Sequence, residues 1–191
     1  MNEIAADRKT VWNDAARSGL VLGGVSIAYM LFNLLMEKLS GRGGAVSAIV
    51  NVSSVLVWIF KVYLCIRLMK FFMEKFARNH EGVINSDTFR FGFATALLSA
   101  LLFSAFYLAW VSFVQPDMFK DAIDAAMESY SEILPASQMS SFDELLPKMP
   151  TLTFFTNFFW CLLFGTVLSA IFSRNIPPRN PFADQSDQEQ L

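Results

Sequence analysis

Four polar side chains interrupt long apolar stretches of this sequence, and they are the residues best placed to do chemistry there. When the four stretches are aligned as membrane crossings, each polar residue lies about five residues from the middle of its stretch, toward the same membrane surface. The four are Asn33, Asn51, Tyr107 and Asn157. An asparagine in hydrocarbon is costly unless it is hydrogen-bonded, so we expect these groups to converge as one interhelical polar layer. We favour a hydrogen-bonded layer that fixes helix register, and the alternative is the floor of a small outward-facing pocket.

A lysine and two cysteines also lie inside apolar stretches. Lys61 would mark a proton or substrate site if its charge faced the protein interior. Because it is about five residues from the positively charged end of its stretch, we expect its aliphatic stem to carry the ammonium group to the lipid headgroups instead. Cys65 and Cys161 are surrounded by apolar residues, where neither thiolate nor zinc chemistry is expected. His80, the only histidine, is predicted to be an ordinary surface residue.

Most other chemistry is absent from the sequence. No apolar stretch contains Asp, Glu or His, which excludes an intramembrane aspartyl or metalloprotease centre. The "GRGG" at 41–44 lacks the Lys-Ser/Thr ending of a phosphate loop, and no C-x-x-C, H-E-x-x-H or G-x-S-x-G occurs. A net charge of -2 gives no field for nucleic acid. We therefore expect no enzyme, no catalytic residue, no cofactor, no metal and no nucleic-acid partner, and we assign no small-molecule ligand.

The elements that must position these side chains are four apolar runs. They cover residues 18–36, 45–66, 91–114 and 151–173. Each approaches the ~20 residues that cross ~30 Å of hydrocarbon as a helix, and backbone amides in lipid must be satisfied within the segment. A cleaved signal peptide is the rival reading of the first run, but the run is too long and no A-x-A-like site follows it. The prediction is an all-α integral membrane four-helix bundle spanning residues 18–174.

The direction of the spans follows from the lysines and arginines between them. One side carries ten: Arg8, Lys9, Arg17, Arg67, Lys70, Lys75, Arg78, Arg90, Arg174 and Arg179. The other side carries four: Lys38, Arg42, Lys120 and Lys148. The positive side stays cytoplasmic, so both termini are predicted inside and the acidic loop at residues 115–150 outside.

That acidic loop is predicted to be an extracytoplasmic amphipathic helical insert between spans three and four. Apolar residues recur at helical spacing from Phe119 to Leu134, with carboxylates mainly on the opposite face. Pro116 suits the first turn, and Pro135 ends the helix. A second short helix is expected at "SFDELL". The carboxylates have the spacing of a solvated face and not of calcium ligands.

The remaining connections are predicted to be cytoplasmic. Residues 67–90 extend the second helix, with Leu68, Phe72 and Phe76 on one face that could lie on the inner leaflet. Gly82 is the expected helix stop. Residues 1–17 form a cytoplasmic segment that could be a short interfacial helix, and the Pro-rich and then polar tail, 175–191, is predicted to be disordered.

Small residues recur every four positions in three spans, which predicts close helix packing. The sets are Gly19 and Gly23; Gly92, Ala96, Ala100 and Ser104; and Cys161, Gly165 and Ser169.

The phrase "FRFGFATALLSALLFSAFYLAWVSFVQPDMF", the acidic helix, the fourth span and the "RNPF" ending together resemble the family catalogued as domain of unknown function 4199. The resemblance covers roughly residues 15–183. It implies a small four-span bacterial membrane protein with an acidic helical insert, and therefore a multi-pass protein of the bacterial inner membrane. It implies no activity and carries over no site residues.

The function most consistent with these features is a structural or protein-interaction role, such as an accessory subunit. The alternative is a small transporter or channel component that uses the polar layer as an outward-facing pocket. The expected partners are the lipid bilayer and either a second copy, as a homo-oligomer, or another membrane protein.

Overall fold

The computed structural model describes residues 8–40, 44–80, 82–130 and 145–176, and this part of the chain is helical without strands. Its helices are α1 (Arg8–Ser40), α2 (Gly44–Asn79), α3 (Asn85–Phe113), α4 (Met118–Tyr130), a 3-10 turn η1 (Leu146–Lys148) and α6 (Met149–Ser173). α1, α2, α3 and α6 are each long and apolar enough to cross a membrane. The predicted all-α fold with four spans is therefore confirmed.

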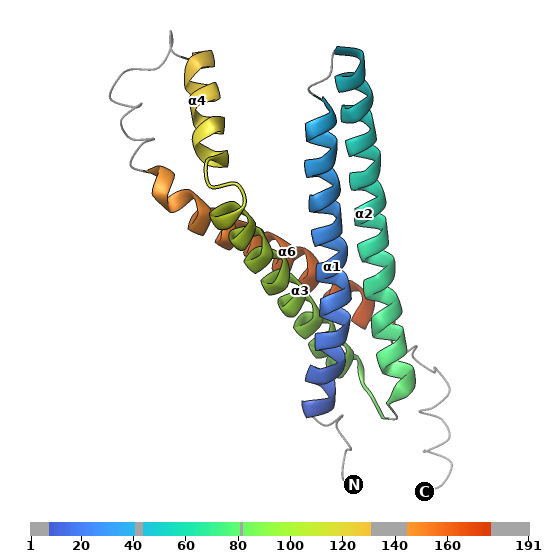
Figure 1. Cartoon of the computed structure of the whole chain (residues 1–191). Helices are drawn as coiled ribbons and strands as arrows, with labels where there is room; N and C mark the ends of the chain where they lie inside the picture. Colours follow the sequence, from blue (N-terminus) through green and yellow to red (C-terminus); the bar gives the residue numbers. More distant parts are fainter. Residues whose placement is uncertain (1–7, 41–43, 81, 131–144, 177–191) are drawn as a thin grey trace, which may run out of the picture.

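The four long helices form two pairs that meet at one end and diverge at the other (Figure 1). α1 lies beside α2, and α3 lies against α6 and also against α1. Two contacts tie the meeting end together. His80 Nε2 lies 3.9 Å from Asp14 Oδ2, and Asn85 Nδ2 donates to the carbonyl oxygen of Arg174 at 3.3 Å. We call this end, where α1 and α3 begin and α2 and α6 finish, the convergent end.

The first two helices are longer than a membrane requires. α1 has 33 residues and α2 has 36, or ~50 and ~54 Å at ~1.5 Å per residue, against ~30 Å of hydrocarbon. Residues 8–17 continue directly into the first span as one helix. α2 ends at Asn79, and Gly82 follows with a φ of 75° that side chains disfavour. The predicted stop at Gly82 is therefore confirmed.

The apolar core lies near the convergent end. Met69, Met73 and Phe76 of α2 pack there against Phe91 of α3 and Ala15 of α1. The Phe76 and Phe91 rings stack with centroids 4.3 Å apart. The expectation that the Phe76 face of α2 lies on the inner leaflet is wrong, because Phe76 is only 2% exposed. The start of α3 offers this face an apolar protein surface, so it packs there.

Small residues set the close contacts of α3 with both of its neighbours, which confirms the packing prediction. A side chain on Gly19 of α1 would approach Leu98 Cβ at 3.0 Å and the Thr95 carbonyl oxygen at 3.1 Å. On the other side, Ala96 of α3 faces Gly165 of α6 with no room for a second methyl group. α3 is therefore the central helix of the fold.

The contact between α3 and α6 also contains a hydrogen bond. Gly92 of α3 lies against Ser169 of α6. The Ser169 hydroxyl, fully buried, donates to the Phe89 carbonyl oxygen at 2.9 Å. A side chain on Gly92 would therefore disturb both the packing and this bond.

α4 follows α3 after a short turn and lies at the diverging end (Figure 1). It has 13 residues and starts at Met118, so Pro116 precedes the first turn in which it was expected to lie. The predicted end of this helix at Pro135 and the second short helix at 141–146 fall mostly outside the described residues. The tail beyond Ile176 also lies outside them.

Candidate functional site

The structure does not join the four polar residues of the expected layer. The Asn33 side-chain oxygen is buried without a hydrogen-bond partner. Asn51 is exposed, whereas Tyr107 and Asn157 are half-buried. Within the described parts of the chain, no hydrogen bond links any two of them, and the Tyr107 ring packs beside Phe103 of its own helix. The layer stays a prediction, and it does not supply the site.

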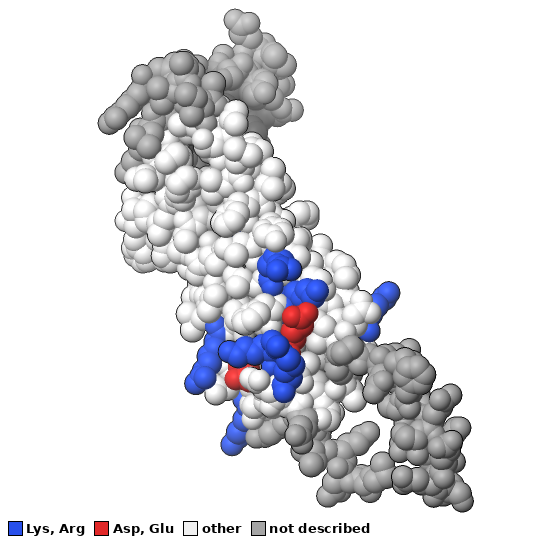
Figure 2. All heavy atoms as spheres, turned by 90° about the vertical axis from the view of Figure 1, so that its right-hand side faces the viewer, with Lys and Arg blue, Asp and Glu red and all other residues white. Residues whose placement is uncertain are grey.

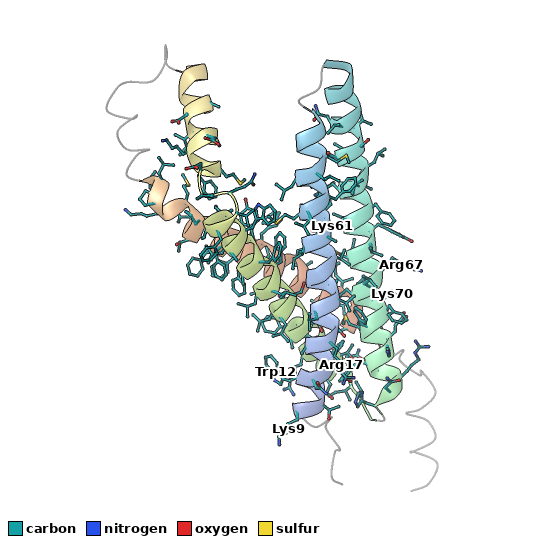
Figure 3. The ribbon with its side chains drawn as sticks, in the orientation of Figure 1. Lys9, Trp12, Arg17, Lys61, Arg67 and Lys70 are labelled. Carbon is teal, nitrogen blue, oxygen red and sulfur yellow. The ribbon has the colours of Figure 1, made fainter. Side chains whose placement is uncertain are left out.

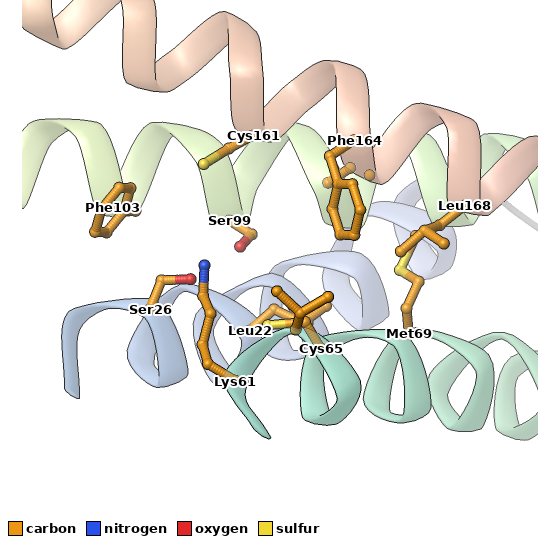
Figure 4. A pocket seen from close by; sticks show the side chains of 13 residues that line it. Leu22, Ser26, Lys61, Cys65, Met69, Ser99, Phe103, Cys161, Phe164 and Leu168 are labelled. Atoms are coloured by element: carbon orange, nitrogen blue, oxygen red, sulfur yellow. The ribbon is translucent and has the colours of Figure 1, made fainter. Parts of the chain in front are cut away.

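A cavity of about 80 Å³ instead lies where the four long helices come together, and Figure 4 shows its lining. Each long helix contributes a polar or sulfur-containing side chain: Ser26 from α1, Lys61 and Cys65 from α2, Ser99 from α3 and Cys161 from α6. The rest of the lining is mainly Leu, Val, Met and Phe. The cavity is therefore an apolar space with one cationic group.

Lys61 enters this cavity because of the direction in which α2 runs. Side chains on a helix lean toward its N-terminus, and the N-terminus of α2 is at the diverging end. The stem of Lys61 therefore leads away from the convergent end. Its Nζ lies 5.7 Å from the centroid of the Tyr29 ring on α1, a cation–π contact. In Figure 4, Nζ points into the space beside the hydroxyls of Ser26 and Ser99. The expected snorkelling to the headgroups is not observed.

No carboxylate of the described residues lies within salt-bridge distance of Lys61. Three ion pairs among the described residues lie nearer the convergent end than Lys61 does. They join Lys70 to Glu74 at 3.6 Å, His80 to Asp14 at 3.9 Å and Arg90 to Asp87 at 3.7 Å. Figure 3 places Lys61 further from that end than Arg67 and Lys70. An ionisable group at membrane depth that lines a cavity is the usual mark of a functional site.

The other charged side chains gather outside the cavity. Figure 2 shows one face of the molecule, on which Lys and Arg side chains, with a few Asp and Glu between them, gather toward the convergent end while the described atoms beyond are uncharged. Arg67, Lys70, Lys75 and Arg78 are all exposed. The described residues contain no group of three or more His, Cys, Asp or Glu that could hold a metal ion.

One sequence signal could have located the cavity. Lys61 and Cys65 lie at four-residue spacing with Met69 and Met73, which are 2% and 0% exposed. Residues four apart share a helix face, so a face that buries two methionines also turns Lys61 inward. The alignment by depth that selected the asparagines did not show toward which side of its helix each side chain points.

Comparison with known proteins gives a match to one protein-family model. No curated protein and no solved structure matches the chain significantly. The family described as "Protein of unknown function (DUF4199)" matches residues 17–174, which include almost all of the four spans and the cavity. The resemblance noted in the sequence is thereby confirmed, and the chain belongs to the DUF4199 family of proteins of unknown function.

Proposed function

We propose that this protein is a multi-pass protein of the bacterial inner membrane with a structural or accessory interaction role and no catalytic activity. The carrying observation is how little of α2 and α6 is buried inside the chain. In the most apolar 18-residue segment of α2 and of α6, only 6% is buried inside the protein, whereas the same share is 28% for α1 and 22% for α3. α2 and α6 therefore present most of their surface to the membrane, where a second copy or another membrane protein can pack.

Large aromatic side chains on these two helices support that role. Trp58 of α2 is 54% exposed, and Trp160 of α6 is 73% exposed. Helices associate in lipid through van der Waals packing and interhelical hydrogen bonds, and each of these tryptophans offers a large contact surface and one indole N–H donor.

Photo-crosslinking from defined positions in native membranes tests this proposal. A photoreactive residue at position 58 or 160 should yield a discrete crosslinked protein band, which mass spectrometry then identifies as a second copy or another protein. The matched control is position 73, where Met73 is fully buried and should give no crosslink to another chain. Crosslinks to lipid alone from both exposed positions would refute the interaction role.

The proposal places both termini in the cytoplasm and α4 outside. It rests on the positive-inside rule, because most described cations lie near the convergent end, whereas Lys38, Lys120 and Lys148 lie toward the other end. Single cysteines at exposed Ser86 and Asp124, in a chain lacking Cys65 and Cys161, test it. An impermeant maleimide should label position 124 in intact cells and position 86 only after permeabilisation. The reverse pattern would invert the orientation.

The alternative function, a small transporter or channel component with an outward-facing pocket, is favoured by one observation. The cavity is lined by all four long helices and holds the charge of Lys61 within the candidate span of α2. Neither Asn51 nor Asn157 lines this cavity, so it is not the pocket that the polar layer would form.

A further inference from the structure

We propose that the Lys61 cavity is a binding site for a carboxylate group, presented by an amphiphilic acid whose apolar chain lies along the apolar lining of the cavity. This goes beyond the interaction role, which concerns the outer surfaces of α2 and α6. The proposal names Lys61 as the anion-binding group, with Ser26 and Ser99 as the hydroxyls beside it.

The charge of Lys61 is the first reason. An ammonium group away from water is costly unless an anion or several acceptors neutralise it. Among the described residues, the ammonium group of Lys61 contacts the Tyr29 ring and otherwise faces the cavity. No described carboxylate completes an ion pair with it. A ligand with one negative charge would supply the missing partner.

The size and polar content of the cavity select the kind of anion. A volume of about 80 Å³ holds a group the size of a carboxylate but not a bulky headgroup. Phosphate sites usually combine Arg or Lys with several backbone N–H donors, and here the lining contains one cation and two serine hydroxyls. Neither the Ser26 nor the Ser99 hydroxyl makes a hydrogen bond to another described group, so both can donate to a carboxylate oxygen. A monoanion therefore fits better than a phosphate.

The apolar lining indicates what carries the carboxylate. Phe103 lies at one side of the space, and Phe164 and Leu168 lie across it from Leu22 (Figure 4). An acyl chain can lie against these apolar side chains while its carboxylate reaches Lys61, because it thereby gains apolar surroundings.

The two native cysteines allow a direct test, because Cys65 and Cys161 are the only ones in the chain and both line the cavity. The full-length protein, in a neutral detergent, is labelled with N-ethylmaleimide at rising concentrations of oleate, acetate or oleyl alcohol. Oleate should slow the labelling of both cysteines, whereas oleyl alcohol, which has the chain but no charge, should protect at least about tenfold less well. Equal protection by oleyl alcohol and oleate would overturn the proposal.

The acetate arm distinguishes the two sources of a carboxylate. Protection by oleate alone indicates a membrane amphiphile. Protection by acetate at comparable concentrations indicates a soluble acid, supports the carboxylate site and removes the acyl-chain part of the proposal. Protection by neither acid overturns the site altogether.

Variants then assign the contact to Lys61. Lys61→Gln should weaken oleate protection by about tenfold or more, because a charge-assisted hydrogen bond is lost. Lys61→Arg should retain most of it, which also keeps the test decisive if Lys61→Gln folds poorly. The matched control is Lys70→Gln, on the same helix but exposed and paired with Glu74. Unchanged protection in Lys61→Gln, or equal loss in Lys70→Gln, would contradict the assignment.

Discussion

Replacing Gly165 by alanine tests whether the contact between α3 and α6 holds the convergent half together. A methyl group at position 165 would clash with the Ala96 methyl across the interface. The Ala96 methyl is attached directly to the backbone and cannot rotate away, so the two helices must separate. Overpacking of this kind costs about 1–3 kcal/mol. Alanine also has a higher helix propensity than glycine, by up to about 1 kcal/mol. The expected net loss is therefore about 0–2 kcal/mol.

Gly24→Ala is the matched control. Nothing lies within 4 Å of a side chain built on Gly24, so only the propensity term applies and the variant should gain up to about 1 kcal/mol. The two variants carry the same chemical change in helices of the same protein. They should therefore differ by about 1–3 kcal/mol in the free energy of unfolding, measured by reversible SDS titration in mixed micelles with far-UV circular dichroism.

A double variant separates the clash from other effects of the new methyl group. Ala96→Gly combined with Gly165→Ala moves the methyl from α3 to α6 and leaves one methyl at the contact. Its propensity gain and loss cancel, so its stability should return to within about 0.5 kcal/mol of the wild type. If the double variant is no more stable than Gly165→Ala, or if Gly165→Ala behaves like Gly24→Ala, then this contact does not carry the packing described above.

Three further predictions concern single side chains. Ser169→Ala removes the interhelical bond to Phe89 and should cost about 0.6–1.7 kcal/mol in the same titration, whereas Thr166→Ala, whose hydroxyl bonds within its own helix at 2.7 Å, should cost less; equal losses would contradict the role of the interhelical bond. Gly82→Ala places a side chain at φ 75° and should cost about 1–2 kcal/mol without changing helix content. Lys61→Met, measured without added fatty acid, should stabilise the protein by on the order of 1 kcal/mol because it removes an unpaired charge; a loss of stability would show that the charge is already compensated.

The spans were predictable because their signal is one-dimensional. A run of apolar residues long enough to cross hydrocarbon must be a helix, whatever surrounds it. The stop at Gly82 was equally local, since a positive φ favours glycine. Small residues at four-residue spacing also predicted close packing, because only such faces let backbones approach, as Gly19 and Gly165 do.

The cavity depends on three-dimensional relations that the sequence does not state directly. Aligning Asn33, Asn51 and Asn157 by depth fixed one coordinate, whereas convergence also needs the rotation of each helix and the angle between the pairs. The pairs diverge toward the end where these residues lie, which leaves Asn51 exposed. Lys61 was misjudged because its distance from the headgroups was considered and the direction of its helix was not. The methionines below it on α2 held the missing information.

The length of α2 has a consequence for the cations along its final turns. Arg67 and Arg78 are about eleven residues apart, which is ~16 Å along a helix. The Debye length at physiological ionic strength is ~8 Å. If Arg67 lies at the surface of an anionic leaflet, Arg78 is about two screening lengths further from the bilayer when α2 stands upright. The lipid then holds Arg67 and Lys70 electrostatically, whereas Lys75 and Arg78 scarcely sense its charge. One helix thus carries some basic residues within the electrostatic reach of the bilayer and others beyond it.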